Sequence, residues 1–173
     1  MYKGKQYGTP VTYPDTPLGQ RLKLIAQFID AGLPERVYYA TLDGFDTHAR
    51  QAPSHARLMQ TLGDAVAAFQ KDVTHHGHSK RVLTMTFSEF GRRVQENGSQ
   101  GTDHGAASQM FFVGQPVKPG VIGKHPSLTD LDRGDLKHHT DFRSLYTTVL
   151  DQWLGVDPSN VLAERFDPVE ILG

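Results

Sequence analysis

Apolar residues recur at helical spacing in three stretches of the chain. The first stretch follows Thr16 and a proline, a pair typical of a helix start, and it stops before Gly32. The second covers residues 58–73 and runs into the sequence HHGH, where the glycine is typical of a helix end. The third follows Asp141, a residue type that caps helices, and continues to position 153. This pattern predicts three amphipathic helices.

Segments rich in β-branched and aromatic residues predict strands at 36–42, 81–87 and 110–113. The first strand leads into the loop DGFDTHARQAPS, and the second leads into the long polar loop SEFGRRVQENGSQGTDHG. Residues 1–15 are rich in Gly, Pro, Tyr and Thr, which indicates an extended N-terminal arm. Residues 16–173 are then expected to form one α/β domain.

The order helix, strand, helix, strand, strand, helix predicts a layered α/β/α fold with a mainly parallel sheet. Three strands leave both edges of such a sheet open, and parallel strands normally need helices on both faces. Either further strands lie within residues 115–140, or the chain is part of a larger sheet. We favour the second interpretation.

Composition narrows the class of protein. The 173 residues fit one domain, and 18 basic against 19 acidic residues give a net charge of −1. This balance argues against nucleic-acid binding, which depends on excess positive charge, and no stretch is apolar enough to predict a membrane span. The absence of cysteine excludes disulfides and thiolate metal sites, whereas nine histidines are a clear excess.

The loops after the predicted strands hold the acidic and histidine side chains that could carry chemistry. Ligands of open α/β sheets bind beyond the carboxyl ends of the strands. Oxygen and nitrogen donors without thiolate suit zinc, manganese, magnesium or iron. Turn formation is the alternative role for these residues. We therefore expect one cleft to gather Asp43, Asp46, His48, Glu89, Asp103 and His104.

The remaining polar signals have simpler interpretations. We interpret His75, His76 and His78 as residues that favour a helix end, with weak metal binding by a surface cluster as the alternative. Arg92 could hold an anionic group, because guanidinium matches phosphate or sulfate oxygens, or it could form a surface ion pair. Asn97 and its following glycine indicate a turn and little more.

Four segments carry a family resemblance: GFDTHARQ at 44–51, SEFGRR at 88–93, ENGSQGTDHG at 96–105 and DFRSLYTTVLDQWLG at 141–155. Their content and order resemble the bacterial family of domains of unknown function numbered 1501, over most of this chain. Members of that family resemble the alkaline phosphatase and sulfatase superfamily, α/β proteins with two-metal sites at the carboxyl edge of a large sheet. Many members carry a twin-arginine export signal. The resemblance implies an alkaline-phosphatase-like core, of which this chain resembles the C-terminal portion.

The resemblance also implies roles for individual residues. Asp46 and His48 are similar to the ligands that follow one strand of the superfamily, and His104 is similar to the later histidine that completes one metal centre. Glu89 stands where an Asp-His pair usually follows the next strand, and Phe90 stands at the place of the second ligand. Two further residues have weaker implied roles: Asp103 as a ligand or a partner of an imidazole, and Asp43 as an optional ligand.

This resemblance implies a metal-dependent hydrolase of phosphate or sulfate esters, acting on a small anionic ester or a sulfated glycan. Zinc is the first metal expected, with manganese, magnesium and calcium as alternatives. The superfamily's nucleophile comes from an earlier strand, and nothing in residues 1–35 resembles it, so a fragment lacking the nucleophile is expected. The full-length protein is expected to be exported, and this chain to be cytoplasmic if complete. The alternative is a non-catalytic metal- or glycan-binding module that keeps the fold.

Overall fold

The computed structural model describes residues 7–173, and residues 1–6 of the predicted arm lie outside the described residues. The chain divides into two units. The first contains the chain up to Val82 together with Glu96–Thr102 and Val113–Gln115. The second contains Leu83–Gln95, Asp103–Phe112 and Pro116–Gly173.

The first unit begins with the predicted helix, α1 (Pro17–Asp30). Thr16 caps it, because its side-chain oxygen accepts a hydrogen bond of 3.1 Å from the backbone N–H of Gly19. The helix ends two residues before Gly32, whose φ of +71° is a conformation that glycine adopts at little cost. Both predicted helix signals are confirmed.

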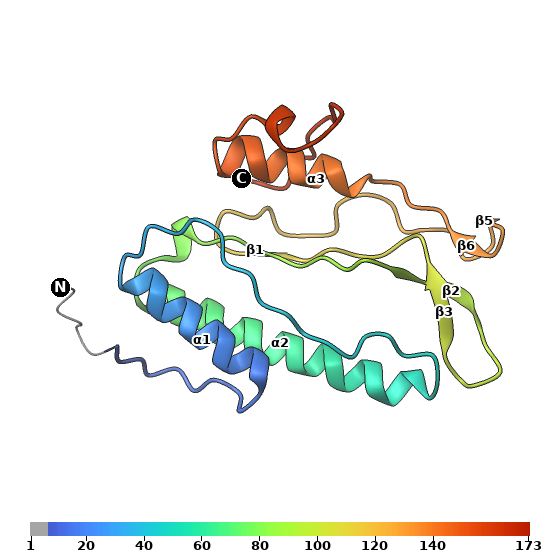
Figure 1. The fold of residues 1–173 in the computed structure, drawn as a ribbon, viewed down its shortest axis with the longest axis horizontal. Helices are drawn as coiled ribbons and strands as arrows, with labels where there is room; N and C mark the ends of the chain where they lie inside the picture. The colour runs from blue at the N-terminus through green and yellow to red at the C-terminus, as the bar shows by residue number, and fades with distance from the viewer. Residues whose placement is uncertain (1–6) are drawn as a thin grey trace. The chain divides into compact units, whose positions relative to one another are not determined.

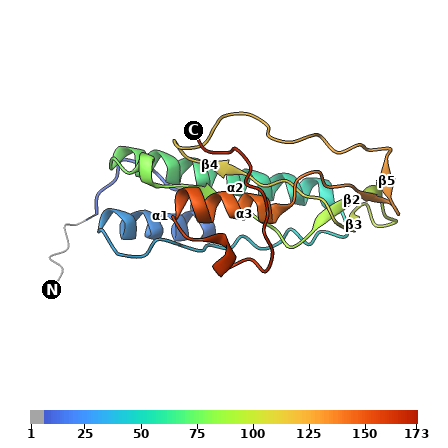
Figure 2. The same cartoon turned by 90° about the horizontal axis from the view of Figure 1, so that it is seen from above.

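The long second helix, α2 (Gln51–His75), has 25 residues and ends at the predicted HHGH sequence. Gly77 has a φ of +77°, and the N–H of His78 donates to the carbonyl of Val73 at 2.7 Å, as at a helix end closed by glycine. Figure 1 and Figure 2 show α1 and α2 side by side, with their C-terminal ends together. Their facing sides, joined by Tyr13 before α1 and Val82 after α2, form the apolar core of this unit: Leu18, Leu22, Ala26, Ile29, Ala65, Ala68, Phe69 and Val73.

The strand predicted at residues 36–42 belongs to none of the three sheets that the structure has between residues 7 and 173, so that prediction is wrong. The alternation of buried and exposed side chains expected of a strand is nevertheless present in this segment. Tyr38, Ala40 and Leu42 pack against the core, whereas Val37 and Tyr39 are 71% and 70% exposed. The physical reason is that alternation sets which side chains face the core, but a strand also needs a hydrogen-bonded neighbour.

The strands form three two-stranded sheets. β1 (Thr84–Met85) pairs with β4 (Phe112–Val113), and β2 (Gly91–Glu96) pairs with β3 (Thr102–Gly105). A third, antiparallel sheet pairs β5 (Leu131–Asp132) with β6 (Asp135–Leu136).

Helices and strands thus occur together as predicted, but the described residues contain no mainly parallel sheet. Only parts of the two predicted strands at 81–87 and 110–113 are strands, and the predicted polar loop at 88–105 contains β2 and β3 instead. The hairpin was not predicted because its residues are polar and mostly exposed on both sides, which leaves no apolar alternation to detect.

The second unit ends with α3 (Phe142–Thr148), which Asp141 caps as predicted by accepting from the N–H of Arg143 at 2.9 Å. A π-helical turn, Val149–Trp153, continues it, and short 3₁₀ turns occur at Ser79–Arg81 in the first unit and Pro158–Asn160 in the second. Thr148 is fully buried, and its hydroxyl donates to the carbonyl of Val169 at 2.9 Å. Among residues 7–173, no helix has the length and apolar character needed to cross a membrane.

Candidate metal-binding residues

The first unit places Asp46 and His48 in the loop that leads into α2. Asp46 Oδ1 and His48 Nε2 are 2.9 Å apart. The side chains are 64% and 47% exposed, so both remain reachable from solvent. The pair brings a carboxylate oxygen and an imidazole nitrogen together, which is the donor set predicted from the sequence.

The loop around this pair is anchored on α2. The ring of Phe45 meets the ring of His55 edge to face, with centroids 5.9 Å apart. Gly44 has a φ of +99°, and a Cβ there would lie 3.4 Å from the side chain of Leu58. His55 lies within α2, and its contact with Phe45 helps to hold the loop that carries Asp46. Asp43, at the start of the loop, is exposed.

In the second unit, His104 lies on β3 and stacks on Phe90. The two ring centroids are 3.9 Å apart and the ring planes differ by 6°. The Arg92 guanidinium carbon lies 5.0 Å from the centroid of the Phe90 ring, a cation–π distance. Stacking covers a face of the imidazole, whereas its nitrogens lie at the ring edge and coordinate in the ring plane.

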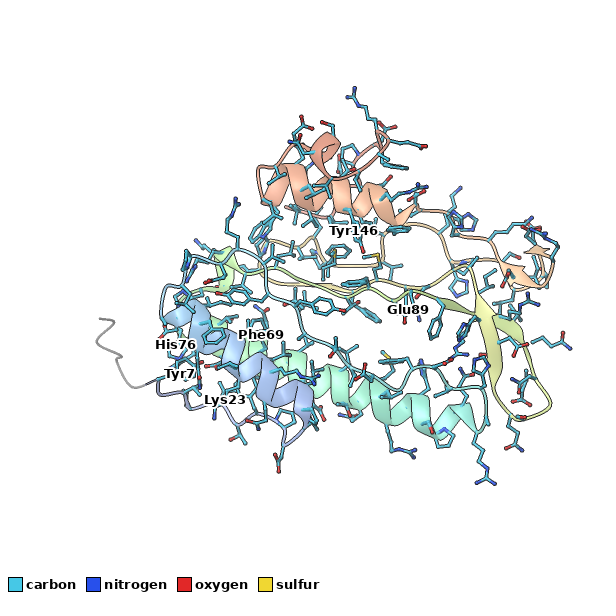
Figure 3. All side chains as sticks on the ribbon, in the orientation of Figure 1. Tyr7, Lys23, Phe69, His76, Glu89 and Tyr146 are labelled. Carbon is cyan, nitrogen blue, oxygen red and sulfur yellow. The ribbon has the colours of Figure 1, made fainter. Side chains whose placement is uncertain are left out.

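Two glycines of the family-like segments bring the backbones of this unit very close. A Cβ at Gly91 would lie 1.7 Å from the carbonyl oxygen of Ala107, and a Cβ at Gly105 would lie 2.7 Å from the backbone of Arg92. Only glycine fits these positions without a backbone shift. The remaining predicted candidates of this unit, Glu89 and Asp103, are exposed. Glu89 lies in the connection between β1 and β2, as Figure 3 shows.

Asp141 caps α3 as the sequence indicated, and Arg143 adds a neighbouring positive charge. Arg143 donates twice to the Asp141 carboxylate, from Nε at 2.9 Å and from Nη2 at 2.6 Å. These side-chain hydrogen bonds lower the pKa of Asp141 to about 2. The guanidinium also covers the ring of Phe166 at 4.2 Å. All of these contacts serve the local structure around the start of α3.

The histidines near the end of α2 do more than the sequence predicted. His76 Nδ1 lies 3.4 Å from Asp30 Oδ1. His78 Nε2 lies 3.1 Å from the same oxygen. Arg81 Nε donates to His78 Nδ1 at 3.2 Å, which makes Nε2 the protonated nitrogen of a neutral His78 and the donor to Asp30. These side chains connect the ends of α1 and α2, in addition to favouring a helix end.

A buried carboxylate beside them was missed by the sequence analysis. Asp72 is fully buried and accepts hydrogen bonds from the hydroxyls of Tyr7, Thr9 at 2.5 Å and Tyr13 at 2.8 Å. His76 Nε2 lies at an ion-pair distance of 3.5 Å from Asp72 Oδ1, without hydrogen-bond geometry. Figure 3 shows Tyr7 beside His76, and their rings stack at 5.0 Å.

Burial, and next the hydrogen bond to Asp72, raise the pKa of both Tyr7 and Tyr13 above the usual value. One pattern in the sequence could have revealed this buried network. Asp72 and His76 have the i, i+4 spacing of a helix and share a face with Phe69 and Val73. An acidic residue on an apolar helix face requires partners, and the arm supplies them.

A comparison with protein families decides what the chain is related to. The model of one family, described as "Protein of unknown function (DUF1501)", matches residues 7–167 of the 173. The chain belongs to the DUF1501 family. No curated protein matches the chain, and no solved structure matches it.

The DUF1501 match spans both units and every candidate residue named above. It also contains Phe90, the residue at the place where the sequence resemblance called for a second ligand. The family description gives no activity, so the chemistry of this DUF1501 protein rests on its own side chains.

Proposed function

We propose that this DUF1501 protein is a metal-dependent hydrolase of phosphate or sulfate esters, of the alkaline phosphatase and sulfatase type. The observation that carries the proposal is the exposed pair of Asp46 and His48, with ligand atoms 2.9 Å apart. A divalent metal ion bound there would polarise an ester oxygen and favour ionisation of water.

The pair fits a zinc ion. Two ligand atoms on one tetrahedral zinc ion lie about 3.3 Å apart, given zinc–ligand distances of about 2.0–2.2 Å. The Asp46 Oδ1 to His48 Nε2 distance of 2.9 Å is close to this separation. Manganese, magnesium and calcium are the alternatives, and the imidazole favours zinc over all three, because these prefer oxygen ligands.

The other proposed ligands come from the family-like segments of the second unit. We propose His104 as a ligand, with Glu89 as a ligand and Asp103 as a ligand or a partner that orients an imidazole. Arg92 is proposed to bind the anionic group of the substrate, because a guanidinium matches phosphate and sulfate oxygens. Asp43 is the weakest candidate, and no residue of this chain is proposed as the nucleophile.

The finer fold assignment is also a proposal. We propose a layered α/β/α core with a mainly parallel sheet. Large exposed apolar side chains support it: Phe87, Phe111, Val121 and Leu128 are 43–96% exposed, and further strands or helices would cover them. Export through a twin-arginine signal remains a prediction that rests on the family resemblance.

One observation favours a second candidate function, a non-catalytic module that binds a metal or an anionic glycan. Phe90 stands where the superfamily has a ligand, and a phenyl ring cannot coordinate zinc. Its stacking on His104 gives Phe90 a packing role in its own right. A site that has lost one centre could still bind a metal without turnover.

Metal content and hydrolysis together test these proposals. The full chain would be loaded with zinc or manganese and dialysed, and the bound metal would be measured by mass spectrometry. Hydrolysis of aryl phosphates and aryl sulfates would be followed on the same samples. The variants are His48→Ala and His104→Ala. The matched control is His125→Ala, an exposed loop histidine whose Nδ1 contacts the carbonyl of Pro126 at 2.8 Å.

Stoichiometric metal and metal-dependent hydrolysis, both lost in His48→Ala and His104→Ala but kept in His125→Ala, would support the hydrolase. Stoichiometric metal without hydrolysis of either ester would support the binding module, and it would overturn the hydrolase if a longer chain that includes a nucleophile segment also failed to hydrolyse them. A metal content that is below stoichiometric and equal in all variants would overturn the metal-binding proposal in both forms.

A further inference from the structure

The loop of residues 97–101, which connects β2 to β3, is closed by the side chain of its first residue. Asn97 Oδ1 accepts from the backbone N–H groups of Ser99 at 2.9 Å and Gly101 at 3.1 Å. The N–H of Asn97 donates to the carbonyl of Gly101 at 2.8 Å, which closes the loop on itself. These bonds alone would make Asn97 the turn former that its sequence indicates.

The other end of the Asn97 amide has a different target. Its Nδ2 donates to the backbone carbonyl of His48 at 3.1 Å. The amide orientation follows from the network, because two N–H donors face Oδ1 and a carbonyl faces Nδ2. Asn97 therefore joins the loop to the backbone of a proposed metal ligand, 49 positions earlier in the chain.

Gly101 lies against the same carbonyl from the same loop. A Cβ at Gly101 would lie 2.3 Å from both the carbonyl carbon and the oxygen of His48. Such an approach is possible only for glycine. Two backbone hydrogen bonds extend the contact. The N–H of Arg50 donates to the carbonyl of Ser99 at 3.0 Å, and the N–H of Gln51 donates to the carbonyl of Gln100 at 2.9 Å. Arg50 itself has a φ of +45°, a strained conformation that these bonds hold.

We propose that Asn97 is a positioning residue for His48. With its carbonyl held by Asn97 and covered by Gly101, the peptide plane after His48 is fixed. The position of the His48 Cα and the direction of its Cα–C bond are then fixed too, and only the backbone ψ and the side-chain torsions remain to place Nε2 beside Asp46. The inference rests on the proposed function, because the residue that Asn97 would position is a ligand of the proposed metal site.

Substitution by aspartate separates positioning from turn formation. In Asn97→Asp a carboxylate oxygen still accepts from the N–H groups of Ser99 and Gly101, but no donor remains for the carbonyl of His48. Asn97→Ser is the second variant, because serine also closes turns of this kind and is too short to reach His48. The matched control is Ser99→Ala, since Ser99 takes part in these contacts through its backbone only.

Two readouts on the full chain test the proposal. The first is the NMR spectrum of the His48 imidazole in metal-free protein, and the second is the affinity for zinc measured by calorimetry. We expect both Asn97 variants to shift and broaden the His48 ring signals, and to weaken zinc binding by about tenfold. We expect Ser99→Ala to leave both unchanged, and the His125 signals to stay the same in every variant.

His48 signals and a zinc affinity equal to those of the wild type in both Asn97 variants would overturn the positioning role. If the wild type bound no zinc while the Asn97 variants still shifted the His48 signals, the positioning of His48 would stand and the proposed metal-binding function would fail. If His48→Ala abolished zinc binding and both Asn97 variants left it intact, the function would stand and the role of Asn97 in it would be overturned.

Discussion

Two Asp–His pairs in the first unit use the same residue types in opposite surroundings. Asp72 is fully buried, and hydroxyl groups of the N-terminal arm surround its carboxylate, with His76 at 3.5 Å. Asp46 is 64% exposed, and its carboxylate lies 2.9 Å from the imidazole of His48, itself 47% exposed. The first pair lies within a hydrogen-bonded network, whereas the second lies in a loop open to solvent.

The difference shows what separates a structural carboxylate from a candidate ligand. A buried carboxylate is stable only when protein donors satisfy it, and those donors leave no room for an ion or a substrate. An exposed pair contributes little to folding, so its geometry is free to serve binding. If this difference holds, mutation of Asp72 should lower stability, whereas mutation of Asp46 should lower metal binding.

The largest effect is expected from Asp72→Ala. Removal of the carboxylate leaves three hydroxyls and His76 without their partner, and breaking a buried charged network costs about 3–5 kcal/mol. Urea unfolding followed by circular dichroism measures the loss. The matched control is Asp64→Ala on the same helix, where an exposed carboxylate accepts from Gln60 at 2.6 Å. A loss equal to that of the control would contradict the division between the two pairs.

An intermediate effect is expected from Tyr13→Phe. It removes one hydrogen bond to a charged group, worth about 1.5–3 kcal/mol, and leaves the ring in the core. The pH dependence of stability identifies the cause. The pKa of Tyr13 in the folded protein is raised above 10.0, its value in an unfolded chain. The Tyr13 hydroxyl therefore keeps its proton to a higher pH in the folded state than in the unfolded state.

The stability that the protonated tyrosine contributes is fully present below pH 10. It falls as the pH rises toward the folded-state pKa, by at most about 1.4 kcal/mol of unfolding free energy per pH unit for each tyrosine. We expect the wild type to lose stability between pH 10 and 11, and Tyr13→Phe to lose it less steeply. The exposed Tyr39 gives the control Tyr39→Phe, which should keep the steep loss. Parallel curves for Tyr13→Phe and the wild type would exclude Tyr13 as the source.

The smallest effect on stability is expected from Asp46→Asn. An exposed ion pair contributes less than about 1 kcal/mol, so the urea midpoint should hardly move. Zinc affinity should fall by more than tenfold, because an amide oxygen is a much weaker zinc ligand than a carboxylate. Calorimetric titration of the full chain measures it. A large loss of stability with unchanged zinc affinity would reverse the comparison and make this pair structural.

The helices could be predicted from the sequence because their signals are local. Thr16 and its proline, Asp141, and the glycine in HHGH act within a few residues, and each marks a helix end in the structure. The strands could be predicted only in part, because a strand depends on a distant partner: β1 and β4 lie within the predicted segments 81–87 and 110–113. Residues 36–42 have the right alternation but lie outside the sheets, whereas β2 and β3 pair without any apolar alternation.

The candidate site could also be predicted only where its signals are local. The spacing of Asp46 and His48 already placed a carboxylate and an imidazole in one loop, and the structure brings them into contact. The role of Asn97 was not predictable, because its contact with His48 spans 49 positions and its local sequence is typical of any turn. Asp72 was missed for the same reason, since its partners lie in an arm about 60 positions away.

The contacts of Asp72 also bear on the order of folding. Its bonds to Tyr7, Thr9 and Tyr13 join residues 65, 63 and 59 positions apart, so the chain must close long loops before they form. The helix end that carries Asp72 must exist before the arm can dock on it. We therefore expect residues 7–15 to dock late in folding, and their amide protons to exchange when the end of α2 opens rather than by independent fraying.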